Sequence, residues 1–217
     1  MVSYEVVDVL YRSRITLLEH LESVGYNTEP YSKFSPKEIA EMIKAGPVAG
    51  APPALSMELS KKPDSQAYEK CLVVYTIGKI KQKLQAFTKK IIDPEEGFDS
   101  ATTELIIITL EPIAPNFNAM AFQLWMGSQT KVRYFQAASI VNNPLKHILV
   151  PKHEKVPAEE EDELLKSLHA TKAQLPLIRF HEDPIARILG LVPKDIVKIT
   201  RPSLTGGEAI GYRLCVP

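Results

Sequence analysis

The sequence has no excess of charge of either sign, and this absence bounds its relation to nucleic acids. Among its 217 residues, Lys and Arg together number 26, as do Asp and Glu, so the formal net charge is zero. A protein that holds nucleic acid alone, by neutralising phosphates, usually carries a basic excess. We therefore expect any contact with nucleic acid to be local and to be supported by partner proteins.

Cysteine is scarce, and long apolar runs are missing. The two cysteines, Cys71 and Cys215, lie far apart within apolar, strand-like runs, a pattern that fits neither a disulfide framework nor a zinc site. The beginning of the chain lacks a basic stretch followed by an apolar run, and no apolar run approaches the roughly 20 residues that a membrane helix needs. We expect an intracellular, soluble protein in a reducing compartment, with no membrane partner.

The usual patterns of a catalytic or cofactor-binding site are missing as well. The sequence has no glycine-rich phosphate loop and no Gly-x-Ser-x-Gly elbow. Its five histidines form no close metal-ligand pair of a recognised type. We expect neither a cofactor nor a metal, and no catalytic residue. The content of 45% hydrophobic and 24% charged residues is instead that of an ordinary globular chain with a sizeable core.

What is present in the first half predicts helices alternating with strands. Apolar residues at helical spacing predict a helix over residues 4–24, ended by Gly25. A second helix is expected to begin after Ser35, since Pro36 suits the first helical position and Glu38 completes a capping box. Strands are expected over residues 54–59 and 71–77, and helices over residues 80–92 and 116–126.

Residues 103–110, with the sequence TELIIITL, predict the clearest strand. The run is apolar on both faces, which suits the buried centre of a sheet with helices on either side. Residues 132–140 are expected to form a last strand or a short helix. This alternation predicts an α/β layer fold over residues 1–142. Asn142–Asn143–Pro144 marks the boundary, so the second domain is expected over residues 143–217.

The second domain is expected to be a small mixed α/β unit. The acidic run Glu159–Glu163 suits a solvated helix start, and that helix should end near Leu168. Asp183 and Pro184 predict a capped short helix, which Gly190 would end. Strands over residues 196–201 and 209–215, with a glycine-containing turn between them, predict a hairpin at the end of the chain.

The segment from Leu175 to Leu214 resembles the C-terminal domain of the fifth subunit of eukaryotic nuclear RNA polymerases, and the small archaeal counterpart of that subunit looks like this domain alone. The elements that carry the resemblance stand in one order with the family's spacing: Leu175–Pro176, Asp183–Pro184, Ala186–Arg187, Gly190, Val197–Lys198–Ile199, Arg201–Pro202–Ser203, Thr205, Gly207 and Tyr212–Arg213–Leu214. Residues 147–153 fit the family's entry into the same domain. In the first half the order of elements fits but few residues match, as in a divergent eukaryotic member or one from a large DNA virus.

The resemblance implies a non-catalytic, structural subunit of a multisubunit DNA-directed RNA polymerase. It implies a restriction-endonuclease-like α/β jaw domain first, near downstream DNA, and then a small assembly domain that docks on the largest subunit. The partners would be the largest subunit, the other polymerase subunits and, in the assembled complex, downstream DNA. The compartment would be the nucleus or, for a viral member, the virion or a cytoplasmic viral factory.

Docking residues are implied at Arg201, Pro202 and Ser203. Proline ends or edges a strand and so blocks indiscriminate strand pairing, while arginine offers a planar fork to a carboxylate or carbonyl. Two further candidate residues, Arg187 and Arg213, are equally open to interpretation as surface charges. Strand alternation puts Tyr212, the last candidate, on the opposite face from Arg213, so one of them must face away from the small core.

Two features are candidates for proximity to DNA. A local basic patch, with no acidic residue between positions 71 and 92, is formed by Lys81, Lys83, Lys89 and Lys90, with Lys79 beside them. Such a patch either skims a phosphate backbone or is a solvated helix face. The resemblance adds the proline turn after the central strand, which Pro115 matches here with Asn116 beside it.

Two rival functions are a nuclease and a free-standing transcription regulator. The jaw domain of the family resembles restriction-class nucleases, whose sites need a metal-binding Asp followed by Asp/Glu-x-Lys on a strand. Asp64 is present, but no Asp/Glu-x-Lys occurs in the chain, and the adjacent pair Glu69–Lys70 would point to opposite faces of a strand. Neutral charge and the lack of a recognisable DNA-reading helix argue against a regulator.

Overall fold

The computed structural model of the chain describes residues 4–45, 54–63, 68–93, 97–203 and 205–217. Two compact units follow one another, Met1–Asn143 and Pro144–Pro217, here called the first unit and the second unit. Each unit combines helices with one four-stranded sheet. The chain is therefore a mixed α/β protein with two sheets.

The sheet of the first unit has the expected apolar strand in its interior. Its strand order is β1 (Met57–Ser60), β2 (Lys70–Thr76), β3 (Thr103–Thr109), β4 (Val132–Gln136). The first pair is antiparallel and the other two pairs are parallel. All seven residues of β3 are buried. The prediction of a central, doubly covered strand is thus confirmed, and β1 is shorter than predicted because it begins only at Met57.

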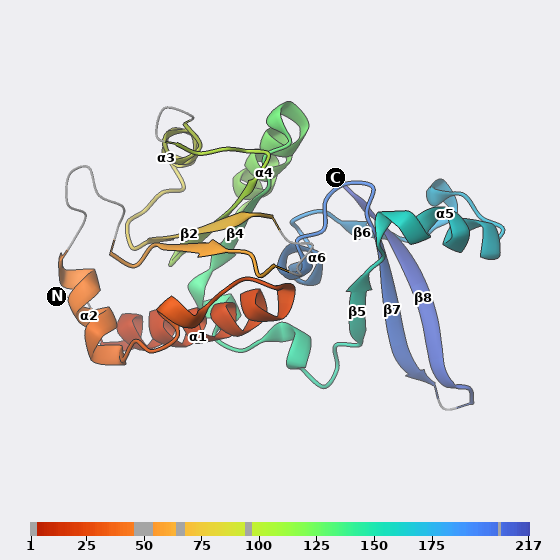
Figure 1. The fold of residues 1–217 in the computed structure, drawn as a ribbon, viewed down its shortest axis with the longest axis horizontal. Helices are drawn as coiled ribbons and strands as arrows, with labels where there is room; N and C mark the ends of the chain where they lie inside the picture. Colours follow the sequence, from red (N-terminus) through yellow and green to blue (C-terminus); the bar gives the residue numbers. More distant parts are fainter. Residues whose placement is uncertain (1–3, 46–53, 64–67, 94–96, 204) are drawn as a thin grey trace. The chain divides into compact units, whose positions relative to one another are not determined.

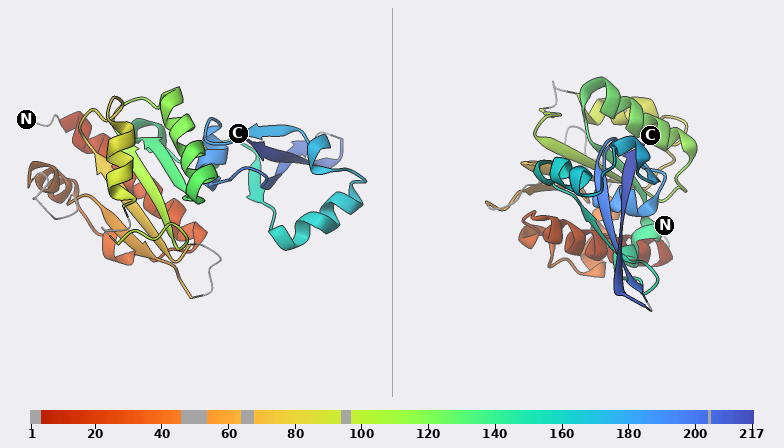
Figure 2. Two further views of the ribbon diagram at one scale, coloured as in Figure 1. Left: turned by 90° about the horizontal axis from the view of Figure 1, so that it is seen from above. Right: turned by 90° about the vertical axis from the view of Figure 1, so that its right-hand side faces the viewer.

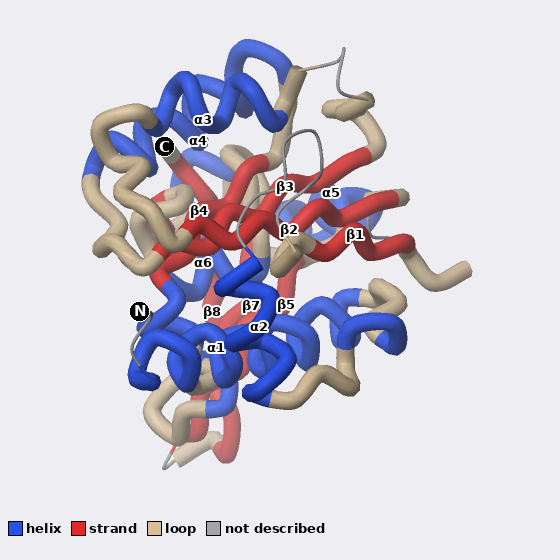
Figure 3. Tube along the Cα trace, turned by 90° about the vertical axis from the view of Figure 1, so that its left-hand side faces the viewer, coloured by secondary structure: helices blue, strands red, loops and turns tan. Residues whose placement is uncertain are grey.

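Helices cover both faces of this sheet. The helices α3 (Leu84–Ile91) and α4 (Pro115–Ser128) lie on one face, while α1 (Tyr4–Val24) and α2 (Pro36–Ala45) lie on the other (Figures 1, 2 and 3). Both α3 and α4 join neighbouring parallel strands in the same direction, and right-handed crossovers put such helices on the same face. Short 3-10 turns complete the unit at Glu29–Tyr31 and Ala137–Ile140.

The predicted end of α1 and the predicted start of α2 are confirmed. Gly25 has a φ of 108°, and its N–H donates to Leu21 O over 3.1 Å, so glycine ends α1 in the left-handed region. At the start of α2, Ser35 N donates to Glu38 Oε2 over 2.7 Å and Glu38 N donates to Ser35 Oγ over 3.4 Å. These two bonds form the capping box that the sequence predicts.

The helix expected over residues 80–92 begins later than predicted. The backbone N–H groups of Ile80 and Lys81 both donate to Glu111 Oε2, over 2.7 and 3.0 Å. That carboxylate follows β3 and is 30 residues away from Lys81 in the chain, so no local pattern indicates its contact. The loop is held in this way until α3 starts at Leu84.

The second unit is a small sheet with two helices. Its strand order is β5 (Lys152–Lys155), β7 (Ile196–Ser203), β8 (Gly207–Val216), β6 (Leu177–Arg179). The helices are α5 (Ala158–Ser167) and α6 (Pro184–Leu189), with 3-10 turns at Pro144–Lys146 and Lys172–Gln174. The terminal hairpin, formed by β7 and β8, and both helices are confirmed. The edge strands β5 and β6 have only four and three residues, too short for a period-two pattern to predict them.

A compact apolar cluster stabilises the second unit. Val156, Leu175 and Ile196 are buried together, and the partly buried side chains packed against them come from α5 and β8: Leu164, Leu165, Tyr212 and Leu214. At the start of α6 the Asp183 carboxylate accepts from Ile185 N and Ala186 N over 2.8 and 3.2 Å, which confirms the predicted cap. In the part of the chain that the structure describes, no helix is long and apolar enough to cross a bilayer.

Candidate partner-binding and DNA-proximal surfaces

A buried ionic cluster lies where β3 and β4 begin. Glu104, which is 2% exposed, accepts from Tyr26 Oη over 3.3 Å through one oxygen. Its other oxygen lies 2.7 Å from Arg133 Nε and 3.2 Å from Lys131 Nζ. Burial alone would raise the pKa of this carboxyl, but the charges of Arg133 and then Lys131 outweigh burial, so its pKa lies below the usual value.

This cluster corrects the description of residues 103–110 as apolar on both faces. Glu104 pairs with Cys71 of β2 in the sheet, and the neighbouring Leu105 pairs with Val132 of β4. The ion pair therefore joins adjacent strands, and both of its charges are shielded from water. Since both carboxylate oxygens of Glu104 already have partners within the fold, the cluster is structural and is not poised for chemistry.

The four lysines predicted to lie near DNA are exposed. Lys89 and Lys90 lie in the last turn of α3, Lys83 precedes its first residue, and Lys81 lies in the loop before it. Exposed lysines in this number make a surface that phosphates can approach, and a solvated helix face would have the same exposure. The geometry alone is therefore compatible with both interpretations of the sequence.

The predicted proline turn lies directly beside this patch. Pro115 is the first residue of α4, and Asn116 Nδ2 donates to Lys81 O over 3.1 Å. The first turn of α4 has no acidic residue, and Ala114 before it has no capping side chain, so the positive end of the helix dipole faces the loop of Lys81. Lys81 thus adjoins the proline turn, although 35 residues separate it from Asn116 in the sequence. We call the four lysines, Pro115 and Asn116 together the lysine–proline surface.

The docking residues Arg201, Pro202 and Ser203 lie at the end of β7. Their strand partners are in β8 alone, with Pro202 opposite Glu208, because the pairing of β7 with β5 ends at Thr200. This end of the hairpin is therefore a two-stranded ribbon that extends beyond β5 (Figure 1). Arg201 and Pro202 are exposed and Ser203 is half-buried, so the end of the ribbon is accessible to a partner.

The other three docking candidates take part in the fold of the second unit. Arg187 Nε donates to His181 O over 2.8 Å, and burial lowers the pKa of this guanidinium. Arg213 Nη1 donates to Leu177 O of β6 over 3.2 Å, while Tyr212 packs on the apolar cluster around Ile196. Tyr212 is thus the one of the two neighbours that faces that cluster. A partner contact by any of these three residues stays a prediction.

Comparison with known proteins matches the second unit and part of the first. Residues 142–215 match the model of the family described as RNA polymerase Rpb5, C-terminal domain. The DNA-directed RNA polymerase subunit Rpo5 of Archaeoglobus fulgidus is 59% identical over 70 residues, which are 32% of this chain and 91% of that protein. The chain belongs to the Rpb5 family. The predicted resemblance to the fifth polymerase subunit is thereby confirmed.

Two other members of the Rpb5 family match longer stretches of the chain. Subunit Rpo5 of Sulfurisphaera tokodaii is 45% identical over 80 residues, which are 37% of this chain and 94% of that protein. The subunit rpabc1 of DNA-directed RNA polymerases I, II, and III of Dictyostelium discoideum is 36% identical over 128 residues. That match covers 59% of this chain and 64% of the slime mould protein. It is longer than the second unit and therefore reaches into the first.

The described residues offer little to the rival interpretation of this Rpb5 family member as a nuclease. Asp64, the candidate metal ligand, lies outside them. Lys70 in β2 forms an ion pair with Glu58 of β1 over 3.1 Å, and both side chains are exposed. Among the residues that the structure describes, no group of three or more His, Cys, Asp or Glu could hold a metal ion.

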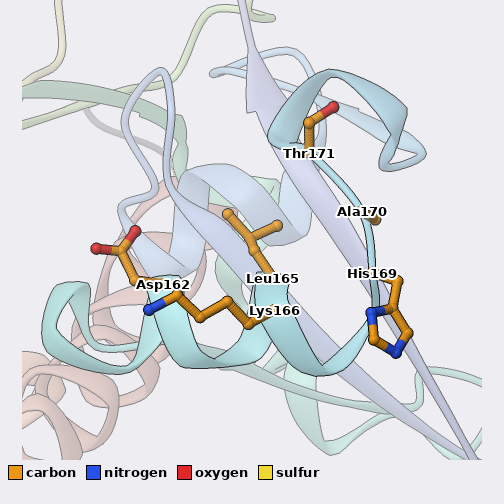
Figure 4. A pocket seen from close by; sticks show the side chains of 6 residues that line it. All are labelled: Asp162, Leu165, Lys166, His169, Ala170 and Thr171. Carbon is orange, nitrogen blue, oxygen red and sulfur yellow. The ribbon is translucent and has the colours of Figure 1, made fainter.

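An open hollow lies at the end of α5. It is lined by Asp162, Leu165, Lys166, His169, Ala170 and Thr171. Figure 4 shows the carboxylate of Asp162 and the imidazole of His169 pointing in different directions. A carboxylate that acts on an imidazole must lie within hydrogen-bond reach of it, so this pair is not arranged for acid–base work.

Proposed function

We propose that the chain is a non-catalytic, structural subunit of a multisubunit DNA-directed RNA polymerase. The second unit is its assembly domain, and the first unit is a restriction-endonuclease-like jaw beside downstream DNA. The role as a polymerase subunit rests on the match to two archaeal polymerase subunits. The match covers 91% of one of these proteins and 94% of the other. Those relatives have almost nothing else with which to join an enzyme, so attachment belongs to this unit.

The partner of the assembly domain is the largest polymerase subunit, which meets the ribbon at Arg201, Pro202 and Ser203. An exposed arginine at the end of the ribbon offers a charged fork, and the adjacent Pro202 lacks the N–H that pairing with a further strand would need. Other polymerase subunits are further partners. The compartment is that of the transcription machinery, which is the nucleus for a cellular eukaryote and the virion or a cytoplasmic factory for a virus.

Replacing Arg201 by glutamate is expected to weaken co-purification of the tagged chain with the largest subunit by about 10-fold or more. An arginine that becomes buried when an interface forms contributes strongly to binding. The charge reversal lies on an exposed residue, so the melting temperature should not change. Reversal of Lys166, an exposed lysine in the last turn of α5, is the control and should leave co-purification intact. Wild-type recovery of Arg201→Glu would exclude this residue from the interface.

The DNA-facing role of the jaw belongs to the lysine–proline surface, where exposed lysines, an uncapped helix start and the proline turn adjoin one another. DNA contact through such a surface is non-specific, because phosphates carry no sequence information. It adds to the hold of the assembled enzyme on DNA and does not bind DNA strongly alone, in keeping with the zero net charge of the chain.

Reversing all four lysines of this surface, Lys81, Lys83, Lys89 and Lys90, is expected to leave assembly intact and to make elongating complexes dissociate at lower salt. The slope of log affinity against log salt should fall by about 1 for each lysine that contacts a phosphate. The measurement is complex lifetime across a salt series. A matched control reverses four exposed lysines elsewhere in the first unit: Lys33, Lys37, Lys44 and Lys61. Equal salt profiles for the two variants would leave the four lysines as a solvated helix face.

A further inference from the structure

Two adjacent aliphatic side chains of the second unit lie almost entirely in water. Ile148 is 95% exposed and Leu149 is 82% exposed, whereas the other exposed large apolar residues of the described second unit, Leu168, Leu177 and Ile210, are between 41% and 54% exposed. Water-exposed aliphatic side chains that adjoin one another commonly mark a surface that a partner covers. We call Ile148 and Leu149 the aliphatic knuckle.

The knuckle is held by an ordered turn. His147 N donates to Pro144 O over 3.2 Å, and Val150 N donates to His147 O over 2.8 Å. Leu149 N donates to the Nδ1 atom of His147 over 3.2 Å. The backbone that carries the two side chains is thus fixed before any partner arrives, so binding would lose little chain entropy.

The knuckle lies at the same end of the sheet as the docking ribbon. It precedes β5 by two residues, and Lys152 at the start of β5 pairs with Thr200, the neighbour of Arg201. Figure 1 shows β5 beginning at the end of the sheet toward which β7 runs before the hairpin turns. Exposed Arg201 therefore puts a positive charge at the end of the sheet that carries the knuckle, whereas the ammonium of Lys152 is already paired with Glu154 over 2.7 Å.

We infer that Ile148 and Leu149 are the apolar anchor with which the second unit docks on another polymerase subunit. The inference rests on the proposed function, and it adds an anchor to the ribbon. The occupant is an apolar groove with a carboxylate beside it, since the knuckle is aliphatic and the exposed guanidinium of Arg201 lies at the same end of the sheet. DNA does not fit, because phosphates gain nothing from aliphatic side chains.

The test is the variant Ile148→Ser/Leu149→Ser in the full chain, co-expressed with the other polymerase subunits. Since both side chains already lie in water, the variant should keep the wild-type circular dichroism and melting temperature. We expect its recovery in the assembled enzyme to fall by at least about 10-fold, because well-packed apolar anchors dominate interface affinity. The matched control, Leu168→Ser/Leu177→Ser, removes two other exposed leucines of this unit and should assemble normally.

A photo-crosslinking side chain at position 148, followed by identification of the crosslinked protein, shows which surface covers the knuckle. Crosslinks to another polymerase subunit support the inference. Crosslinks confined to the first unit of the same chain or to a second copy of the chain overturn it, as does normal assembly of the double serine variant. Failure of the wild-type chain itself to join the polymerase would refute the proposed function instead, so the two failures are distinguishable.

Discussion

Replacing Glu104 by leucine is expected to lower the free energy of unfolding of the first unit by about 3–5 kcal/mol, the usual loss when one partner of a buried ion pair is removed. Arg133 is 4% exposed and lies 2.7 Å from the carboxylate that would be lost. Lys131, which is 3.2 Å from the same oxygen, would then face this guanidinium without an intervening negative charge. Denaturant unfolding at neutral pH measures the loss.

A double variant separates the ion pair from the packing around it. Glu104→Leu/Arg133→Met removes both charges and keeps apolar volume, so it should be more stable than Glu104→Leu alone. Loss of less than about 1 kcal/mol in the single variant would show that the cluster contributes no more than an exposed pair. Glu58→Leu is the matched control, since the ion pair of Glu58 with Lys70 is exposed and its removal should cost little.

The same cluster should make the first unit sensitive to acid. Because the folded-state pKa of Glu104 lies below its unfolded value, its contribution to stability is complete above the unfolded pKa of about 4.3 and is lost as the pH falls through the folded pKa. The wild type should therefore lose stability below about pH 4 more steeply than Glu104→Leu. Parallel stability curves for the two proteins in this range would contradict the assignment.

The second large effect is expected on division of the chain. Residues 144–217 alone should fold and should still bind the polymerase, whereas residues 1–143 alone should not bind it. The second unit has its own sheet and apolar cluster, and relatives that are polymerase subunits consist almost wholly of the segment that matches this chain. Cooperative thermal unfolding of the fragment and its recovery with the largest subunit are the measurements.

A replacement within the apolar cluster provides the control for that experiment. Ile196 is fully buried, and Ile196→Ala should cost about 2–5 kcal/mol, enough to unfold a small domain with limited stability. Binding by the fragment should then disappear together with its fold. If residues 1–143 bound the polymerase as well as the full chain does, attachment would have to be assigned to the first unit.

Much of the local structure follows from short stretches of sequence. Ser35 and Glu38 cap α2, Asp183 caps α6, and Gly25 ends α1, because each of these signals acts within a few residues of its own backbone. The β-branched run of β3 likewise predicts a buried central strand. The short strands β5 and β6 were not predicted. They are strands because they pair with β7 and β8, and their own residues show no strand pattern.

By itself, the sequence determined that this is a neutral mixed α/β chain whose last third resembles the assembly domain of a polymerase subunit. Only the tertiary structure decided that Glu104 meets Arg133, that Asn116 meets Lys81, and that Ile148 and Leu149 lie in water. The first two facts join residues about 30 positions apart through strand register and loop placement, which no local pattern encodes. The exposure of Ile148 and Leu149 also depends on the tertiary structure, because the sequence does not distinguish an aliphatic side chain in a core from one on the surface.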